Sequence, residues 1–150
     1  MIPEQQMIAV RRIASIMGGE PLLRRRVRSL ADLQAAVAEG LPKATLERTV
    51  RHVVPDRGEA RRLIARIVPP ATYKRRKALL KPEESEKVER LARVIATAEE
   101  VWDDENDARR FLTSPHPLLG DQRPIDVAQT ELGARQIEEL LWQIMHGLPV

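Results

Sequence analysis

Residues 56–80, DRGEARRLIARIVPPATYKRRKALL, contain two short helical patterns on either side of a proline pair. In the first, apolar side chains recur at three- and four-residue steps, as on one face of a helix: Ala60, Leu63, Ile64 and Ile67. Pro69-Pro70 interrupts the pattern, because the residue before a proline is pushed toward extended geometry. A short, strongly basic helix follows. Residues 59–80 therefore predict a helix-turn-helix, whose second helix can lie in the major groove of DNA.

The second helix of this motif carries the candidate contacts to DNA phosphates and base edges: Thr72, Tyr73, Lys74, Arg75, Arg76 and Lys77. For Tyr73, closing the hydrophobic core of the motif is an equally good role. The proline pair stands where such a motif usually has a glycine-containing turn. The docking angle of the second helix, and with it sequence-specific readout, therefore stays open.

Helical periodicity extends over nearly the whole chain, and no run of alternating residues is bounded by hairpin turns. We therefore expect an all-α protein. Residues of the types that begin or end helices stand at Ser29, Gly40, Pro42, Pro82, Thr130 and Gly147. Ser29 and Thr130 suit N-caps, and Pro42 suits a first helical position. The proline-rich residues 113–136 are expected to form a stiff connector before the last helix.

Charge divides the 150-residue chain into two unlike halves. Residues 1–77 hold 17 Lys/Arg against 7 Asp/Glu, whereas residues 78–150 hold 8 against 15, although the formal net charge is only +3. A basic half is typical of proteins that contact phosphate backbones, because each contact releases condensed counterions. A solvated basic face is the alternative. The asymmetry indicates two partners of opposite character.

The sequence contains no recognisable catalytic or metal-binding constellation. Its three histidines, His52, His116 and His146, are widely spaced, and there is no cysteine. P-loop, Rossmann and nucleophile-elbow patterns are also missing. We therefore expect a protein that is not an enzyme and needs neither cofactor nor metal, with a small metal-dependent enzyme as a remote alternative. Without cysteines, a secretory signal or a run of roughly 20 apolar residues, the expected location is the cytoplasm.

Residues 88–147 resemble the toxin-binding domain of the Xre/MbcA/ParS antitoxin family over nearly their whole length. The matching positions are Glu99-Glu100-Val101-Trp102, Ala108, Phe111-Leu112, Pro115, Leu118, Gly120, Arg123-Pro124, Asp126, Thr130, Gly133, Ile137, Leu140, Leu141, Ile144 and Gly147. Upstream, GLPKATLERTV (40–50) resembles a helix start of the family's Xre-type half. The segment TYKRRKALLKPEESEKVERLARV (72–94) resembles its T-x-x-R-R recognition helix and the exit from it. Val68-Pro69-Pro70 departs from the family's turn.

The resemblance implies a type II antitoxin encoded beside a RES-domain toxin, an enzyme that consumes NAD⁺. It implies that residues 1–80 form a helix-turn-helix domain that dimerises and binds operator DNA for autoregulation. Residues 81–150 would form a helical toxin-binding domain that covers the toxin's active-site entrance. The alternative is a helix-turn-helix transcriptional regulator whose C-terminal domain binds a different protein.

Toxin contacts are expected in the loop around Arg123 and Asp126, on the last helix, and in the tail that follows it. The residues beyond that loop are Arg135, Trp142, Gln143, His146, Gly147, Leu148, Pro149 and Val150. Trp142 suits an interface anchor, because buried aromatic residues dominate binding energies. A core position beside Leu141 is an equally good role for it.

Overall fold

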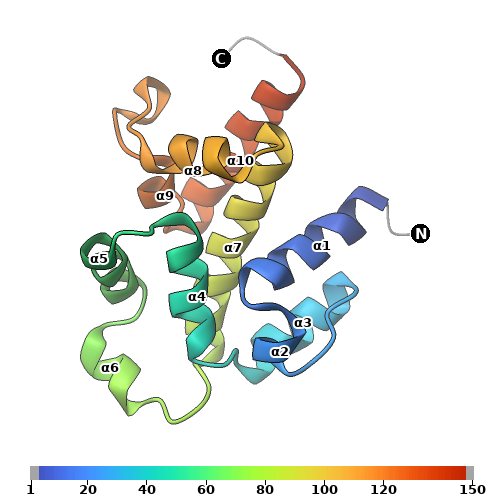
Figure 1. The fold of residues 1–150 in the computed structure, drawn as a ribbon, viewed down its shortest axis with the longest axis vertical. Helices are drawn as coiled ribbons and strands as arrows, with labels where there is room; N and C mark the ends of the chain where they lie inside the picture. The colour runs from blue at the N-terminus through green and yellow to red at the C-terminus, as the bar shows by residue number, and fades with distance from the viewer. Residues whose placement is uncertain (1–3, 148–150) are drawn as a thin grey trace.

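A computed structural model describes residues 4–147, with side chains from residue 9 onward. Within this range the chain forms helices and no strand, as the all-α prediction requires, with isolated β-bridges at Pro42–Leu79 and His116–Gln122. The helices, drawn in Figure 1, are α1 Glu4–Ile16, α2 Gly19–Leu23, α3 Leu30–Glu39, α4 Ala44–Val53, α5 Arg57–Ile67, α6 Pro70–Arg75, α7 Pro82–Trp102, α8 Glu105–Thr113, the 3₁₀-helix Pro117–Leu119, α9 Pro124–Val127 and α10 Glu131–Met145.

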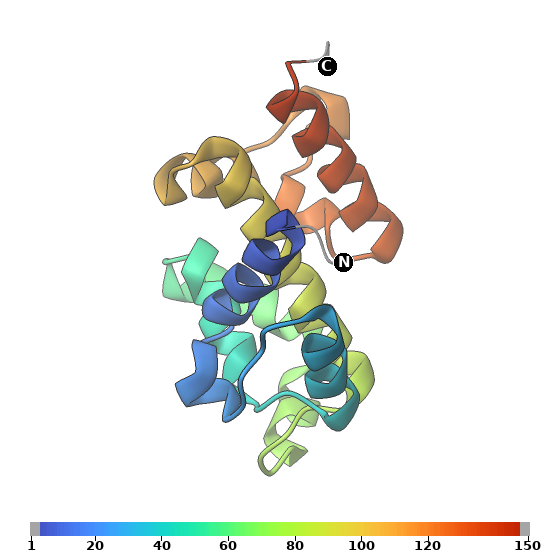
Figure 2. The ribbon, with the colours of Figure 1, turned by 90° about the vertical axis from the view of Figure 1, so that its right-hand side faces the viewer.

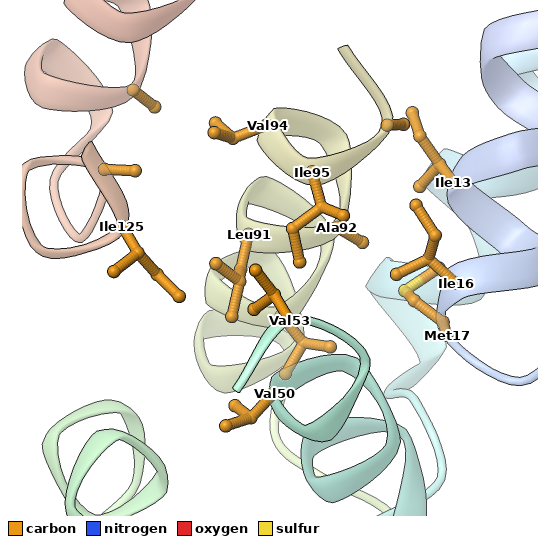
Figure 3. Packing of buried hydrophobic residues seen from close by; sticks show 14 of the residues in the cluster. Ile13, Ile16, Met17, Val50, Val53, Leu91, Ala92, Val94, Ile95 and Ile125 are labelled. Atoms are coloured by element: carbon orange, nitrogen blue, oxygen red, sulfur yellow. The ribbon is translucent and has the colours of Figure 1, made fainter. Parts of the chain in front are cut away.

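Helix α7 is the central element of the fold. It packs against α1, α3, α4, α5, α8 and α10, so both halves of the chain share it. Figure 3 shows side chains of α1, α4 and α9 converging on α7, and the labelled ones are all buried: Ile13, Ile16, Met17, Val50, Val53, Leu91, Ala92, Val94, Ile95 and Ile125. One continuous hydrophobic cluster therefore joins the two halves.

Local signals in the sequence set several helix ends as predicted. The hydroxyl groups of Ser29 and Thr130 accept hydrogen bonds from the backbone N–H groups of Asp32 and Gly133, at 3.1 and 3.0 Å. α3 ends at Gly40, where φ is 99° and a Cβ would collide with the carbonyl oxygen of Leu80. Only glycine fits there, because the backbone is both left-handed and closely approached.

One expectation about local structure was wrong. Pro42 does not occupy the first position of α4, which begins at Ala44. The backbone of residues 41–43 instead pairs with residues 78–80: the N–H of Lys43 donates to Ala78 at 2.9 Å, and that of Leu80 to Leu41 at 2.8 Å. The connector 113–136 holds the 3₁₀-helix and α9, each beginning at a proline.

The two ends of the molecule carry different elements. α6 lies at the lower end of the long axis and the C-terminal end of α10 at the upper end, in both Figure 1 and Figure 2. Among the described residues, no helix is long and apolar enough to cross a membrane.

Candidate functional site

The predicted helix-turn-helix corresponds to α5, the turn Val68-Pro69 and α6. Asp56 caps α5 by accepting a hydrogen bond from the N–H of Glu59 at 2.9 Å, and the chain turns extended at Val68 and Pro69. Pro70 is the first residue of α6, where its missing N–H costs nothing. The proline pair therefore makes a short, rigid turn in place of a glycine turn.

Tyr73 anchors α6 to the rest of the motif. Its ring is half-buried against the core, and its hydroxyl donates to the carbonyl oxygen of Lys43 at 3.4 Å. The ammonium group of Lys43 lies 4.3 Å from the ring centroid, a cation–π contact. Burial, and then the charge of Glu47, raise the pKa of Tyr73. The ring therefore fills the core-closing role that the sequence left open.

α6 and its exit present three exposed cationic residues. Lys74, Arg75 and Lys77 are exposed and form no ion pair among the described residues. Arg75 donates only to the hydroxyl of Thr72, at 3.3 Å, and Thr72 is half-buried. Cations without a protein counter-charge keep their full attraction for phosphate groups.

Arg76 differs from its neighbour Arg75. Its Nε and Nη2 donate to Oε1 and Oε2 of Glu84, both at 2.8 Å, in a bidentate ion pair with α7. The hydrogen bond from Arg76 holds the pKa of Glu84 below its usual range, and the same bond raises the pKa of Arg76. Because its guanidinium group is already occupied, we keep Arg76 out of the proposed DNA contacts.

α5 also supplies exposed cations, which are not among the DNA contacts predicted from the sequence. Arg57 and Arg61 are exposed and line a cleft of about 420 Å³ between α4 and α5, together with Glu47 and Arg51. Their spacing of four residues on the polar face of an amphipathic helix was the signal that could have identified them. We call Arg57, Arg61, Lys74, Arg75 and Lys77 the basic surface.

Arg123 and Asp126 are bound to each other, and Asp126 is also bound to Arg66 in the other half of the chain. Arg123 donates from Nε to Oδ2 of Asp126 at 2.8 Å, and Arg66 of α5 donates to Oδ1 at 2.7 Å. Partial burial alone would raise the pKa of Asp126, but the bonds from Arg123 and Arg66 outweigh it and lower that pKa. This triad ties α9 to α5, and its role in toxin contact stays a prediction.

The predicted residues of α10 share its outer face. Arg135, Trp142 and His146 are exposed and Gln143 is half-buried, whereas Leu141 fills the adjacent core position. Trp142 is 55% exposed, and its ring centroid lies 4.3 Å from that of His146. The core role left open for Trp142 is therefore excluded.

The end of the chain is described only in part. Gly147 has a left-handed φ of 64° after the last turn of α10. Leu148, Pro149 and Val150, which we expect to contact the toxin, lie outside the described residues. His116 has a structural role: its Nδ1 accepts the N–H of Leu118 at 3.1 Å and caps the 3₁₀-helix.

Two family models match the chain. Residues 32–93 match the antitoxin Xre-like helix-turn-helix domain, and residues 97–147 match the antitoxin Xre/MbcA/ParS C-terminal toxin-binding domain. No curated protein matches it. The two matches confirm the predicted order of a helix-turn-helix domain and a helical C-terminal domain. The first matched segment ends at residue 93 and the second begins at residue 97, both inside α7. From the sequence we placed the domain boundary between residues 80 and 81, just before that helix.

Proposed function

The chain belongs to the Xre/MbcA/ParS-type antitoxins, and from this premise we propose that it neutralises an NAD⁺-consuming RES-domain toxin and represses its own operon. The observation that carries the proposal is the match of residues 97–147 to a toxin-binding domain. In this proposal the chain inhibits the toxin by covering its active-site entrance, and the chain itself carries out no chemical step.

The outer face of α10 is the proposed toxin contact. A standard protein interface buries roughly 1,200–2,000 Å² in total, which is enough to seat a small helical domain across the mouth of an active site. Trp142 supplies the kind of large aromatic side chain that dominates such interfaces, and its exposure supports this role. Arg135, Gln143 and His146 would surround it with polar contacts.

The basic surface is the proposed operator contact. Because α6 has only six residues, few base-edge contacts are available to it, and the cations of α5 would add contacts to the phosphate backbone. We propose a homodimer, whose two copies of α6 would read half-sites about 34–36 Å apart, one turn of DNA.

A direct test measures NAD⁺ consumption by the purified RES-domain protein encoded beside this chain. Saturating amounts of the chain should stop the loss of NAD⁺, and the Trp142→Ala variant should require a much higher concentration to do so. Operator binding is measured separately, by fluorescence anisotropy with DNA from upstream of the gene and with a scrambled duplex. If the chain neither binds nor inhibits the RES-domain protein encoded beside it, the antitoxin role is wrong. Specific DNA binding alone would then favour a transcriptional regulator with another protein partner.

A further inference from the structure

Three metal-ligating side chains meet where α4, α7 and α8 come together. His52 stands in the last turn of α4, Glu99 in the last turn of α7, and Glu105 at the start of α8. Each offers one ligand atom, and these atoms all lie within 4.8 Å of one another. Imidazole nitrogen combined with carboxylate oxygen is a donor set that suits Zn²⁺. We propose that His52, Glu99 and Glu105 form a binding site for a divalent transition-metal ion, with Zn²⁺ as the best match.

The buried negative charge of Glu99 favours a cation at this site. Its carboxylate is buried, with the residue only 6% exposed, and its one hydrogen bond among the described residues joins Oε2 to Nε2 of His52 at 2.6 Å. The guanidinium group of Arg12 forms an ion pair with Oε1 at 3.9 Å, a distance too long for a hydrogen bond. A buried carboxylate is costly unless its charge is compensated. A dication on the Oε2 side adds to the compensation that the long ion pair with Arg12 gives.

The local electrostatic field also favours a cation. α4 and α7 both bring their C-terminal ends to the site, and the negative end of each helix dipole attracts positive charge. Residues 99–107 contain six carboxylates and neither lysine nor arginine. Arg109 lies nearby, but its Nη2 donates to the backbone carbonyl of His52 at 3.1 Å, so it positions the end of α4.

Binding requires small movements and one proton transfer. Zinc bonds to nitrogen and oxygen are about 2.0–2.2 Å long, so Nε2 of His52 and Oε2 of Glu99 must separate to about 3.3 Å in a tetrahedral site. Zn²⁺ takes the place of the proton on Nε2 of His52, and that proton moves to Nδ1 of the same ring when that atom is free, and otherwise to solvent. The exposed side chain of Glu105 closes onto the ion, and water completes four ligands. The bound ion would clamp α4 of the helix-turn-helix half to α7 and α8.

The test uses the full-length chain, stripped with EDTA, desalted and titrated with ZnCl₂. Calorimetry should give one zinc ion per chain. With zinc at about 100 times its Kd, the Tm should rise by roughly 5–10 °C. Glu105→Gln should fold with an unchanged Tm without metal, because Glu105 is exposed and forms no ion pair among the described residues. Its zinc affinity should fall at least about tenfold.

Matched variants separate this site from other zinc binding. Glu100→Gln removes an exposed carboxylate next to Glu99 and should leave the zinc affinity unchanged. His146→Gln removes the exposed histidine of α10 and should also leave it unchanged. His52→Gln should lose the zinc response. A wild-type Tm that zinc does not raise would overturn the proposal, as would full zinc affinity in both Glu105→Gln and His52→Gln. Neither toxin nor DNA enters this test, so its result is independent of the proposed function.

Discussion

The basic surface and the outer face of α10 are both exposed, but they offer different physical means of recognition. The basic surface presents cations that form no ion pair among the described residues, and the neighbouring aromatic ring of α6, Tyr73, packs against the core. The face of α10 presents an exposed Trp142 against His146. Cations give fast, salt-dependent association, whereas a large aromatic side chain gives a localised hot spot. Because α6 and the C-terminal end of α10 lie at opposite ends of the long axis, Lys74 and Arg75 should be replaceable without affecting Trp142, and the reverse (Figure 1).

Trp142→Ala is expected to have the largest effect. Losing an aromatic anchor costs about 2–4 kcal/mol of binding free energy, so toxin affinity should fall about 30-fold or more. DNA affinity should not change, and the Tm should change little because the side chain is largely exposed. Surface plasmon resonance with the toxin measures the effect. Leu132→Ala, at the opposite end of α10 and 75% exposed, is the matched control. Less than a twofold loss for Trp142→Ala would remove α10 as the centre of the interface.

The double variant Lys74→Ala/Arg75→Ala should weaken operator binding about tenfold or more at physiological salt. Each lost phosphate contact lowers the slope of log K against log salt by about 0.9, so the slope should fall by roughly 1.8. Toxin affinity should stay the same. Anisotropy titrations between about 0.05 and 0.2 M salt give the slope.

Arg76→Ala is the matched comparison for that double variant. Since Arg76 is paired with Glu84, its loss should leave the salt slope unchanged and lower the Tm slightly. If Arg76→Ala flattened the slope as much as removing Arg75 alone, the distinction between the free and the paired arginine would be wrong.

Asp126→Asn tests whether the main role of the predicted toxin-contact loop is to hold α9 against α5. The variant should lose about 1 kcal/mol of unfolding free energy at pH 7, because charged hydrogen bonds to Arg66 and Arg123 weaken. The pKa of Asp126 is lowered in the fold, so its contribution is present above the ordinary range of Asp and is lost as pH falls below about 4. Chemical denaturation of wild type and variant from pH 7 to pH 3 should show the two curves converging. Asp121→Asn, an exposed change in the same connector, should leave stability unaltered at every pH.

Glu89→Gln should have the smallest effect and the opposite sign. Burial raises the pKa of Glu89, against the charge of Arg93, so the charged form opposes folding at pH 7. A raised pKa in the fold means that stability is lost as pH rises through that pKa. The variant should therefore gain less than about 1 kcal/mol at pH 7 and nothing below about pH 4, where both states are protonated. Thermal melts measure it, with the exposed Glu86→Gln as control. A loss of stability at pH 7 would mean that the ion pair with Arg93 outweighs burial.

The features that the sequence predicted well are those set by nearby residues. Ser29 and Thr130 cap helices because their partners are three residues away. The helix-turn-helix was predictable for the same reason, since its apolar stripe and proline break are adjacent in the chain.

The features that the sequence could not predict depend on residues that are distant in the chain. The sequence gives no reason to assign different roles to the adjacent residues Arg75 and Arg76. Only the path of the loop into α7 places Glu84 next to Arg76. Pro42 was misplaced because residues 41–43 pair with residues 78–80. The cluster of His52, Glu99 and Glu105 was missed because its members come from three helices.

The single long helix α7 also sets the distance and the rotation between the two ends of the protein. Its 21 residues span about 30 Å at 1.5 Å per residue, and no flexible linker separates the segments matched by the two families. The orientation of a toxin on the proposed face of α10 relative to DNA on the proposed basic surface would therefore be set by helical phase. One inserted residue in α7 would rotate one end against the other by about 100°. A toxin held by this chain would thus meet the duplex at one defined angle, and the spacing of neighbouring operator sites would decide whether two toxins fit side by side.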